Sequence, residues 1–285
     1  MTTSINFTKM QGLGNDFIIL NYKEYEKVKI PTDNLATILC DRNFGIGADG
    51  LIIVNPYEES ADIGWIFYNS DGSIAQMCGN GMRCFAKYVH DSGIIDKTQF
   101  SVSTKAGVIV PEIIDSETIR VNMSAPILDP RNIPVKVHDN LNFDIEAGDR
   151  FFIANAVSMG NPHCVIFTEE DTKKLALKYG NYIEKHELFP QKTNVEFVKV
   201  ISSKELVVDV WERGCAITLA CGTGACASVV AAILNNLCEH KVKVNLPGGS
   251  LIIEWDGSLK NTNKDVYMSG PAEYVFTGTI SIPDC

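Results

Sequence analysis

Hydrophobic residues alternate with polar ones, or form short unbroken runs, along most of the chain. These are the patterns of half-buried and fully buried β-strands. Helical spacing of hydrophobic residues is clear in only two places, 82–90 and 225–237. Because most predicted strands follow one another at hairpin spacing, we expect curled, mostly antiparallel sheets instead of a doubly wound parallel sheet. The predicted strands are 17–21, 51–54, 64–68, 108–114, 119–123, 152–156, 164–167, 195–201, 206–211, 241–245, 250–254 and 274–282.

The two predicted helices follow the same short motif. Cys78–Gly81 reads Cys-Gly-Asn-Gly, and Cys221–Gly224, 143 positions later, reads Cys-Gly-Thr-Gly. A predicted strand leads to Asn69 nine residues before the first cysteine, and another leads to Glu212 nine residues before the second. A repeat at this spacing indicates two structurally similar halves.

We therefore expect an α+β fold of two pseudo-symmetric halves, each a sheet around a central helix. The first half is predicted to comprise residues 1–123 plus about 268–285, and the second residues 124–267. Cys78 belongs to the first half and Cys221 to the second. We expect the active site in the cleft between the halves, with one cysteine motif on each side.

A cysteine in a glycine-rich turn at the start of a helix has a particular chemistry. Unpaired backbone N–H groups and the positive end of the helix dipole bind anions there. They also favour the thiolate, so we expect the pKa of such a cysteine to fall from about 8.5 to about 3.5–7.5. Two such cysteines suit inversion of a carbon next to a carboxylate, which needs a base on one face and an acid on the other.

Composition narrows the class of ligand. Lys and Arg number 25 against 35 Asp and Glu, a formal net charge of −10, and no basic cluster offers a surface for nucleic acid. The uncharged stretch 214–238 is long enough to span a membrane, but its polar residues predict a buried helix instead. A small-molecule substrate is therefore expected, with neither nucleic acid nor membrane as partner.

The nine cysteines indicate free thiols. They are odd in number, contain no Cys-x-x-Cys pair, and do not follow zinc-ligand spacing, so no metal site is expected. The chain start lacks the basic and apolar regions of a signal peptide. We therefore expect a cytoplasmic protein. Cys40, Cys84, Cys164, Cys226 and Cys238 are interpreted as core residues.

Several motifs together resemble those of the diaminopimelate epimerase family. They are residues 12–17, 45–50, 68–72, 77–84, 160–163, 212–214 and 220–224, and the resemblance extends from about residue 9 to about residue 280. It implies a homodimeric isomerase without a cofactor, independent of pyridoxal phosphate. Such an enzyme converts LL-2,6-diaminopimelate to the meso form in lysine and peptidoglycan biosynthesis.

The resemblance also assigns roles to residues. Cys78 and Cys221 would be the acid/base pair, and His163 and Glu212 would support the proton transfers. The reacting carboxylate would be bound by Gly79, Asn80, Gly222 and Thr223. The residues that would hold the rest of the substrate, mostly its distal end, are Asn15, Asn69, Asn161, Asn194, Glu212 and Arg213. Adjacent Glu212 and Arg213 suit a distal ammonium and a distal carboxylate.

Two positions depart from the family pattern, and two alternatives stay open. Gly50 stands where some members have a substrate-binding Gln, and Phe276 where some have an interface Tyr. One alternative is an enzyme similar to proline racemase or hydroxyproline epimerase, although the sequence lacks that family's His at position 80 and its Asp-x-x-Pro before the second cysteine. The other is a non-catalytic anion-binding module, although no Walker lysine follows Gly224.

Overall fold

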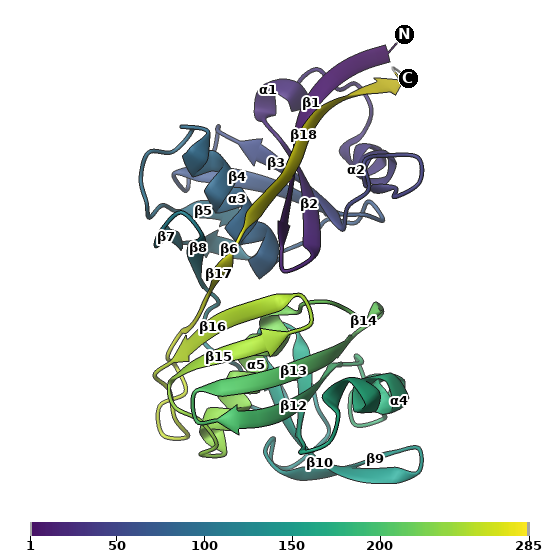
Figure 1. Ribbon diagram of the computed structural model, residues 1–285, viewed down its shortest axis with the longest axis vertical. Coiled ribbons are helices and arrows are strands. Elements are labelled where there is room, and N and C mark those ends of the chain that lie inside the picture. Colours follow the sequence, from purple (N-terminus) through teal and green to yellow (C-terminus); the bar gives the residue numbers. More distant parts are fainter. Residues whose placement is uncertain (1, 284–285) are drawn as a thin grey trace. The chain divides into compact units, whose positions relative to one another are not determined.

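The computed structural model describes residues 2–283, in which the chain forms two units. Unit 1 comprises Met1–Val121 and Gly270–Cys285, and unit 2 comprises Asn122–Ser269. Strands predominate over helices in both units (Figure 1). The predicted α+β class and the two similar halves are confirmed.

The sheet of unit 1 brings the two ends of the chain together. The last strand, β18, pairs antiparallel with the first, β1, along nearly their whole length (Figure 1). A short hairpin of β7 (Pro111–Ile113) and β8 (Thr118–Asn122) follows the sheet in sequence. The strand order is β18 (Glu273–Pro283), β1 (Thr2–Gly12), β2 (Asn15–Leu20), β3 (Gly50–Asn55), β4 (Ile63–Asn69), β5 (Val102–Thr104) and β6 (Gly107–Ile109).

The sheet of unit 2 repeats this plan of neighbouring strands. A two-residue strand, β14 (Ala216–Ile217), pairs with β13 beside the second cysteine motif. The strand order is β17 (Val266–Pro271), β16 (Gly249–Trp255), β15 (Lys241–Leu246), β13 (Glu205–Glu212), β12 (Asn194–Ser202), β11 (Pro162–Phe167), β10 (Arg150–Ser158) and β9 (Phe143–Ala147).

Each sheet is mostly antiparallel but contains two parallel pairs, and a helix lies in the connection of every one. Parallel neighbours need such a crossover because a tight turn cannot join them. In unit 1, α2 (Thr32–Cys40) joins β2 to β3, and α3 (Gly79–Asp91) joins β4 to β5. In unit 2, α4 (Thr172–Glu184) joins β11 to β12, and α5 (Gly222–Leu234) joins β13 to β15. The remaining helix, α1 (Tyr22–Tyr25), is a single turn.

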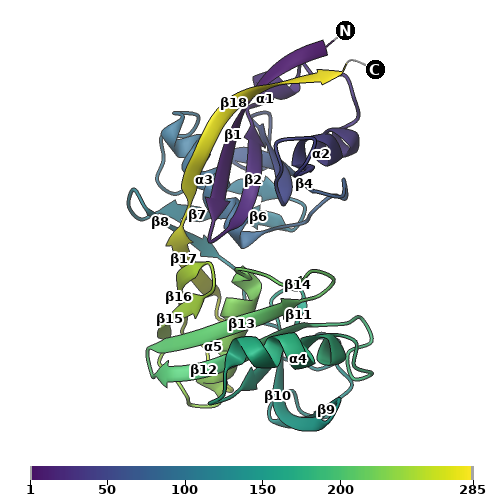
Figure 2. The same cartoon turned by 45° about the vertical axis from the view of Figure 1, so that its right-hand side comes forward.

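The helices that follow the cysteines are central to their units. In unit 1, α3 packs on β1, β2 and β3, whereas α2 packs on β3 and β4. In unit 2, α5 contacts six strands, and α4 lies along β12 and β13 (Figure 2). Strands between helices are buried on both faces, which explains the unbroken hydrophobic run of β3.

Three sequence predictions need correction. The single strand predicted over Val108–Ile114 is wrong: β6 and β7 are separate strands with different partners, divided at Val110 before Pro111. The second helix ends at Leu234, not at Leu237, because Asn235 caps it and Asn236 has a φ of 57°. Cys238 therefore lies beyond the helix and is only partly buried. Other elements, among them β1, α2 and α4, were not predicted.

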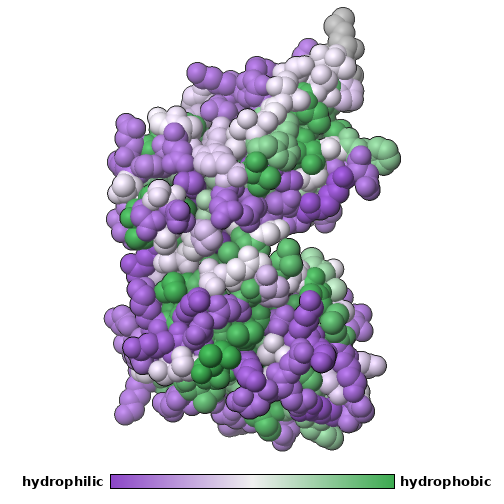
Figure 3. Space-filling model, viewed as in Figure 1, coloured by the Kyte–Doolittle hydropathy of each residue, from purple (hydrophilic) through white to green (hydrophobic). Residues whose placement is uncertain are grey.

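Within residues 2–283, no helix has the length and hydrophobicity that crossing a membrane requires. On the face of each unit drawn in Figure 3, hydrophobic side chains form small islands among hydrophilic ones. The 214–238 stretch includes α5, whose side chains from Gly224 to Leu234 are all buried. The prediction of a buried core helix is confirmed.

Candidate functional site

In unit 1 the first cysteine motif lies against the loop between β1 and β2. Cys78 is the N-cap of α3 and has extended backbone, so the helix begins at Gly79, three residues before the predicted start at Met82. The Cys78 thiol donates to Oδ1 of Asn15 at 3.5 Å, and the Asn80 amide donates to the same oxygen at 3.2 Å. Two predicted substrate ligands and the candidate catalytic thiol are thus brought together.

A charged network fixes the side chain of Asn15 from behind. Its amide donates to Asp49 at 2.7 Å, so Oδ1 must face Cys78. Asp49 in turn accepts from Arg42, which also binds Asp16. Sequence analysis gave these charged residues no role, although Asp16 and Asp49 lie within motifs that it singled out.

Asp16 makes unit 1 sensitive to acid. Burial alone would raise its pKa, but hydrogen bonds from Arg42 and Lys9 outweigh burial and lower it to about 2. A folded-state pKa below the unfolded value of about 3.9 gives stability that is present above pH 4 and lost as the pH falls through 2. The carboxylate is 15% exposed, and the shift corresponds to about 2 kcal/mol of unfolding free energy.

We therefore expect Asp16→Asn to be less stable than the parent at pH 7, with the difference shrinking by about 2 kcal/mol between pH 5 and pH 2. Urea unfolding at a series of pH values measures this difference. Asp139→Asn is the matched control, because the Asp139 carboxylate is 83% exposed. A pH-independent difference for Asp16→Asn would contradict the assignment.

In unit 2 the second cysteine motif has a polar network of its own. Cys221 caps α5, and its sulfur accepts from the N–H of Gly224 at 3.4 Å. Thr223 lies 3.5 Å from that sulfur and accepts from the Asn161 amide at 3.4 Å. Asn161 Oδ1 lies 3.0 Å from Nε2 of the fully buried His163.

The expected low pKa of the motif cysteines is wrong for Cys221. Burial raises the pKa of this thiol well above its usual value, and the nearby carboxylates of Glu212 and Glu196 raise it further. Hydrogen bonds from Thr223 and Gly224 oppose this shift without cancelling it. Burial also raises the pKa of Glu212, against its hydrogen bond from Thr218 at 2.5 Å. Desolvation therefore outweighs the helix dipole here, and Cys221 rests as a thiol.

The strand ends next to Cys221 carry the other predicted ligands. Asn194 accepts from the backbone N–H of Arg213 at 2.9 Å and donates to the carbonyl of Pro162 at 3.1 Å, which joins the 160–163 and 212–214 motifs. The Arg213 side chain is exposed, and its guanidinium donates to the carbonyl of Gln191 at 3.1 Å. In unit 1, Asn69 lies at the end of β4 and donates to Ser73 at 2.9 Å.

Sequence analysis missed one buried acid in this network. Glu196 lies in β12 with no exposed surface, and its Oε1 is 2.7 Å from Nδ1 of His163. The signal was present, because a charged residue stands here inside an apolar strand. No group of three or more His, Cys, Asp or Glu side chains within residues 2–283 is arranged to hold a metal ion.

Gly50 and Phe276, the two positions that depart from the family pattern, are each packed against an aromatic ring. A Cβ atom at Gly50 would lie 2.6 Å from the ring of Phe67 and 2.9 Å from the carbonyl of Tyr68, so a larger residue needs a shift of both. Phe276 on β18 packs edge to face on Phe7, with ring centroids 5.7 Å apart, and keeps 47% of its surface exposed.

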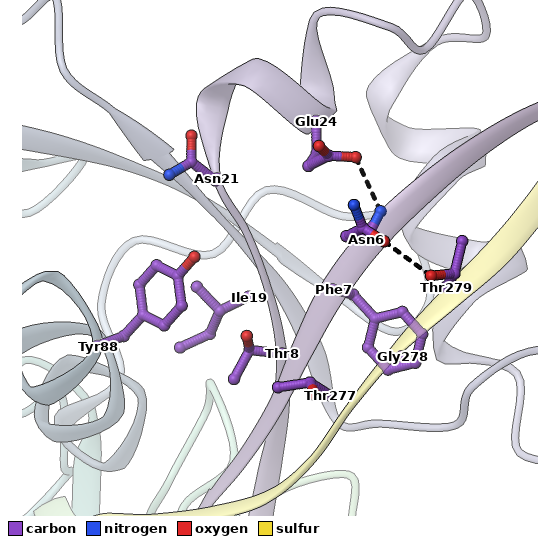
Figure 4. Close-up of a pocket in the computed structure, with 10 residues that line it drawn as sticks. All are labelled: Asn6, Phe7, Thr8, Ile19, Asn21, Glu24, Tyr88, Thr277, Gly278 and Thr279. Carbon is purple, nitrogen blue, oxygen red and sulfur yellow. Dashed lines mark hydrogen bonds between the residues drawn. The ribbon is translucent and has the colours of Figure 1, made fainter. Parts of the chain in front are cut away.

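A polar hollow in unit 1 is separate from these groups. It lies between the β1 and β18 strands and Tyr88 of α3, with Asn6, Thr8 and Glu24 on its wall (Figure 4). None of the predicted site residues lines it. The two cysteine networks, not this hollow, carry the chemistry expected from the sequence.

Comparison with known proteins decides the family. The sequence model of diaminopimelate epimerase matches residues 7–128 and 155–275, which include both cysteine motifs. The chain belongs to the diaminopimelate epimerase family. It is 47% identical to the diaminopimelate epimerase of Halothermothrix orenii, over 98% of this chain and 99% of that one. It is 50% identical to that of Desulforapulum autotrophicum, with the same coverage. The predicted family and enzyme class, an isomerase, are confirmed.

Solved structures show how widely the fold of this epimerase family is shared. A PhzF-family phenazine biosynthesis protein of Bacillus anthracis aligns with a TM-score of 0.71 at 13% identity, over 98% of this chain and 100% of that one. A hydroxyproline epimerase of Agrobacterium vitis aligns with a TM-score of 0.70 at 12% identity, over 99% and 93%. At these identities the likeness concerns the fold alone.

Proposed function

We propose that this chain epimerises LL-2,6-diaminopimelate to meso-diaminopimelate with Cys78 and Cys221 as a two-thiol acid/base pair. The observation that carries the proposal is that a cysteine caps the central helix of each unit, at the end of the same strand, loop and helix order. The identity of 44–50% to several diaminopimelate epimerases along nearly the whole chain supports the substrate.

The reaction removes one proton from the α-carbon and adds one proton to the same carbon. A thiolate removes the proton from the α-carbon on one face, which leaves a carbanion, and the thiol on the other face donates its proton to the same carbon. The reverse reaction exchanges these roles, so no external acid, oxidant or cofactor is consumed. The raised pKa of Cys221 suits it to be the thiol that donates. This mechanism needs one thiol on each face of the α-carbon.

The starts of the two helices would bind the reacting carboxylate. Gly79 and Asn80 begin α3, and Gly222 and Thr223 begin α5, where backbone N–H groups have no partner within the helix. Negative charge spreads onto the carboxylate when the α-proton leaves, so N–H donors at this point stabilise the transition state more than the substrate. His163 and Glu212, next to the second motif, would support the proton transfers.

The remaining predicted ligands would hold the distal end of the substrate. Arg213 would pair with the distal carboxylate and Glu212 with the distal ammonium, a combination that recognises a second amino-acid group. The amides that would complete the site are those of Asn15, Asn69, Asn161 and Asn194.

The proposal is tested by giving the purified protein LL-diaminopimelate without pyridoxal phosphate or metal. Chiral chromatography should show the meso form appearing, and the same mixture should form from the meso side. L-Proline and hydroxyproline, offered in parallel, should stay unchanged. Racemised proline with untouched diaminopimelate would favour the other racemase family, and no turnover of either would favour an anion-binding module.

We also propose that the chain works as a cytoplasmic homodimer. The eight cysteines among residues 2–283 form no disulfide bond with one another, in keeping with a reducing compartment. Three consecutive residues of β18, Tyr274 to Phe276, expose 44–52% of their surface and place apolar side chains on both faces of this edge strand, which a second copy could cover. Light scattering on the purified protein should give twice the chain mass, and Phe276→Asp should shift it to the monomer.

A further inference from the structure

Glu196 is a buried acid for which the reaction as described has no use. It has no exposed surface, and its second oxygen, Oε2, has no hydrogen-bond partner among the residues that the structure describes. Burying a carboxylate and leaving one oxygen unpaired destabilises a fold, and an apolar residue of similar size would serve the sheet better. The position of this carboxylate therefore points to a role beyond packing.

The hydrogen bonds of His163 fix its protonation pattern. Nε2 faces the amide oxygen of Asn161 at 3.0 Å, and an amide oxygen only accepts, so Nε2 carries a proton. In the same orientation, the Asn161 NH₂ group donates to the Thr223 hydroxyl at 3.4 Å. On the other side of the ring, Nδ1 lies 2.7 Å from Glu196 Oε1, within hydrogen-bond distance. Glu196 thus selects the orientation of the imidazole that donates to Asn161.

The same carboxylate lies beneath the turn that holds the second thiol. A Cβ atom added at Gly224 would come within 2.7 Å of Glu196 Oε1, so the turn approaches the carboxylate as closely as a glycine permits. The N–H of Gly224 is the donor to the Cys221 sulfur. Glu196 therefore touches both ends of the network, the imidazole and the cysteine turn.

We infer that Glu196 is a positioning residue, which holds His163 with its Nε2–H toward Asn161 and thereby orients the Asn161 amide beside Thr223 and Cys221. The inference rests on the proposed function, because it concerns the alignment of the same site. It acts through His163 and not on substrate. In metal sites, carboxylates that orient an imidazole from behind have this effect, and their loss lowers metal affinity or activity about 10–100-fold.

Two substitutions separate orientation from mere packing. In Glu196→Gln the side-chain NH₂ can donate to Nδ1, which keeps the proton on Nε2, so kcat/KM should stay within about tenfold of the parent. In Glu196→Leu the side chain offers no hydrogen-bond partner to Nδ1 of His163, and kcat/KM should fall about 10–100-fold. Asp209→Asn is the control, because Asp209 is a buried acid of the same sheet whose partner is Thr172, outside this network. It should match the parent.

The ring itself provides a second readout. With ¹⁵N-labelled histidine, NMR at neutral pH should show the His163 Nε2 protonated in the parent, Glu196→Gln and Asp209→Asn. In Glu196→Leu it should show a mixture of the two neutral tautomers. Equal losses of activity in the Gln and Leu variants, or an unchanged tautomer in Glu196→Leu, would overturn the inference. If the Leu variant does not fold, a lost Nε2 proton in Glu196→Gln overturns it.

These outcomes are distinct from failure of the proposed function. A parent protein that does not epimerise diaminopimelate refutes that function, whereas the NMR measurement still tests whether Glu196 orients His163. An active parent with wild-type kinetics in Glu196→Leu refutes the inference and leaves the function standing.

Discussion

Replacing either Cys78 or Cys221 by alanine is expected to lower the rate of epimerisation by about 10²–10⁴-fold, the contribution of a positioned acid or base. Each variant removes either the base that takes the α-proton or the acid that supplies the new one, so both variants should lose activity in both directions of the reaction. Turnover of LL- and of meso-diaminopimelate, followed by chiral chromatography, measures the loss. Near-parental rates in either variant would refute the two-thiol mechanism.

A control and a second substrate make this result specific. Cys238→Ala removes a partly buried thiol of unit 2 that belongs to neither network, and it should keep parental activity. Elimination from a β-halogenated diaminopimelate needs only one base, which takes the α-proton while the halide leaves the neighbouring carbon. At least one alanine variant should retain it, which would also show that the variant is folded.

The second large effect concerns specificity. Lysine lacks the distal carboxylate, so it would leave Arg213 without its partner in the complex. Sites that rely on polar partners reject analogues without them by about 10⁴-fold or more. We therefore expect kcat/KM for diaminopimelate to exceed any value for lysine by at least about that factor. Efficient racemisation of lysine would contradict the roles given to Glu212 and Arg213.

The contribution of Arg213 can be separated from that of the rest of the site. Arg213→Ala should lower kcat/KM for diaminopimelate strongly and narrow the discrimination against lysine, because it removes only the distal partner. Arg131→Ala is the matched control, since Arg131 is an exposed arginine of unit 2 that binds only its neighbour Asp129. It should leave both substrates unaffected.

The sequence predicted those helices and strands whose hydrophobic pattern is contained within their own residues. Both cysteine helices and most central strands follow from runs that repeat 143 residues apart, and each cysteine does cap a helix. The helices α2 and α4 were not predicted, although their buried residues recur at helical spacing, because hairpin-paired strands, which the strand spacing predicts, need no crossover helix. The long β1 strand was missed because its polar, exposed first residues weaken the alternation.

The site was harder to predict where burial decides the chemistry. The family resemblance assigned Asn15 and Thr223 to the substrate site, and in the structure Asn15 lies 3.5 Å from the Cys78 sulfur and Thr223 3.5 Å from the Cys221 sulfur. A helix start alone favours a thiolate, but it takes the tertiary structure to bring two carboxylates and a desolvating core around Cys221 and reverse the direction of its pKa shift. The same holds for Glu196, whose partner His163 comes from the neighbouring strand.

The central claim, that two thiols act on opposite faces of one carbon, is tested most directly by epimerisation in deuterated water. LL-diaminopimelate should give meso product with one deuteron at the inverted carbon from the first turnovers, because the donating thiol has exchanged with solvent. The unreacted LL substrate should at that stage carry no deuterium. Only the thiol that took the α-proton can return a proton to the LL face, and it returns the substrate's own proton. Meso product that retains the substrate's own proton, or deuterium entering LL substrate as fast as product, would indicate a single base and contradict the account.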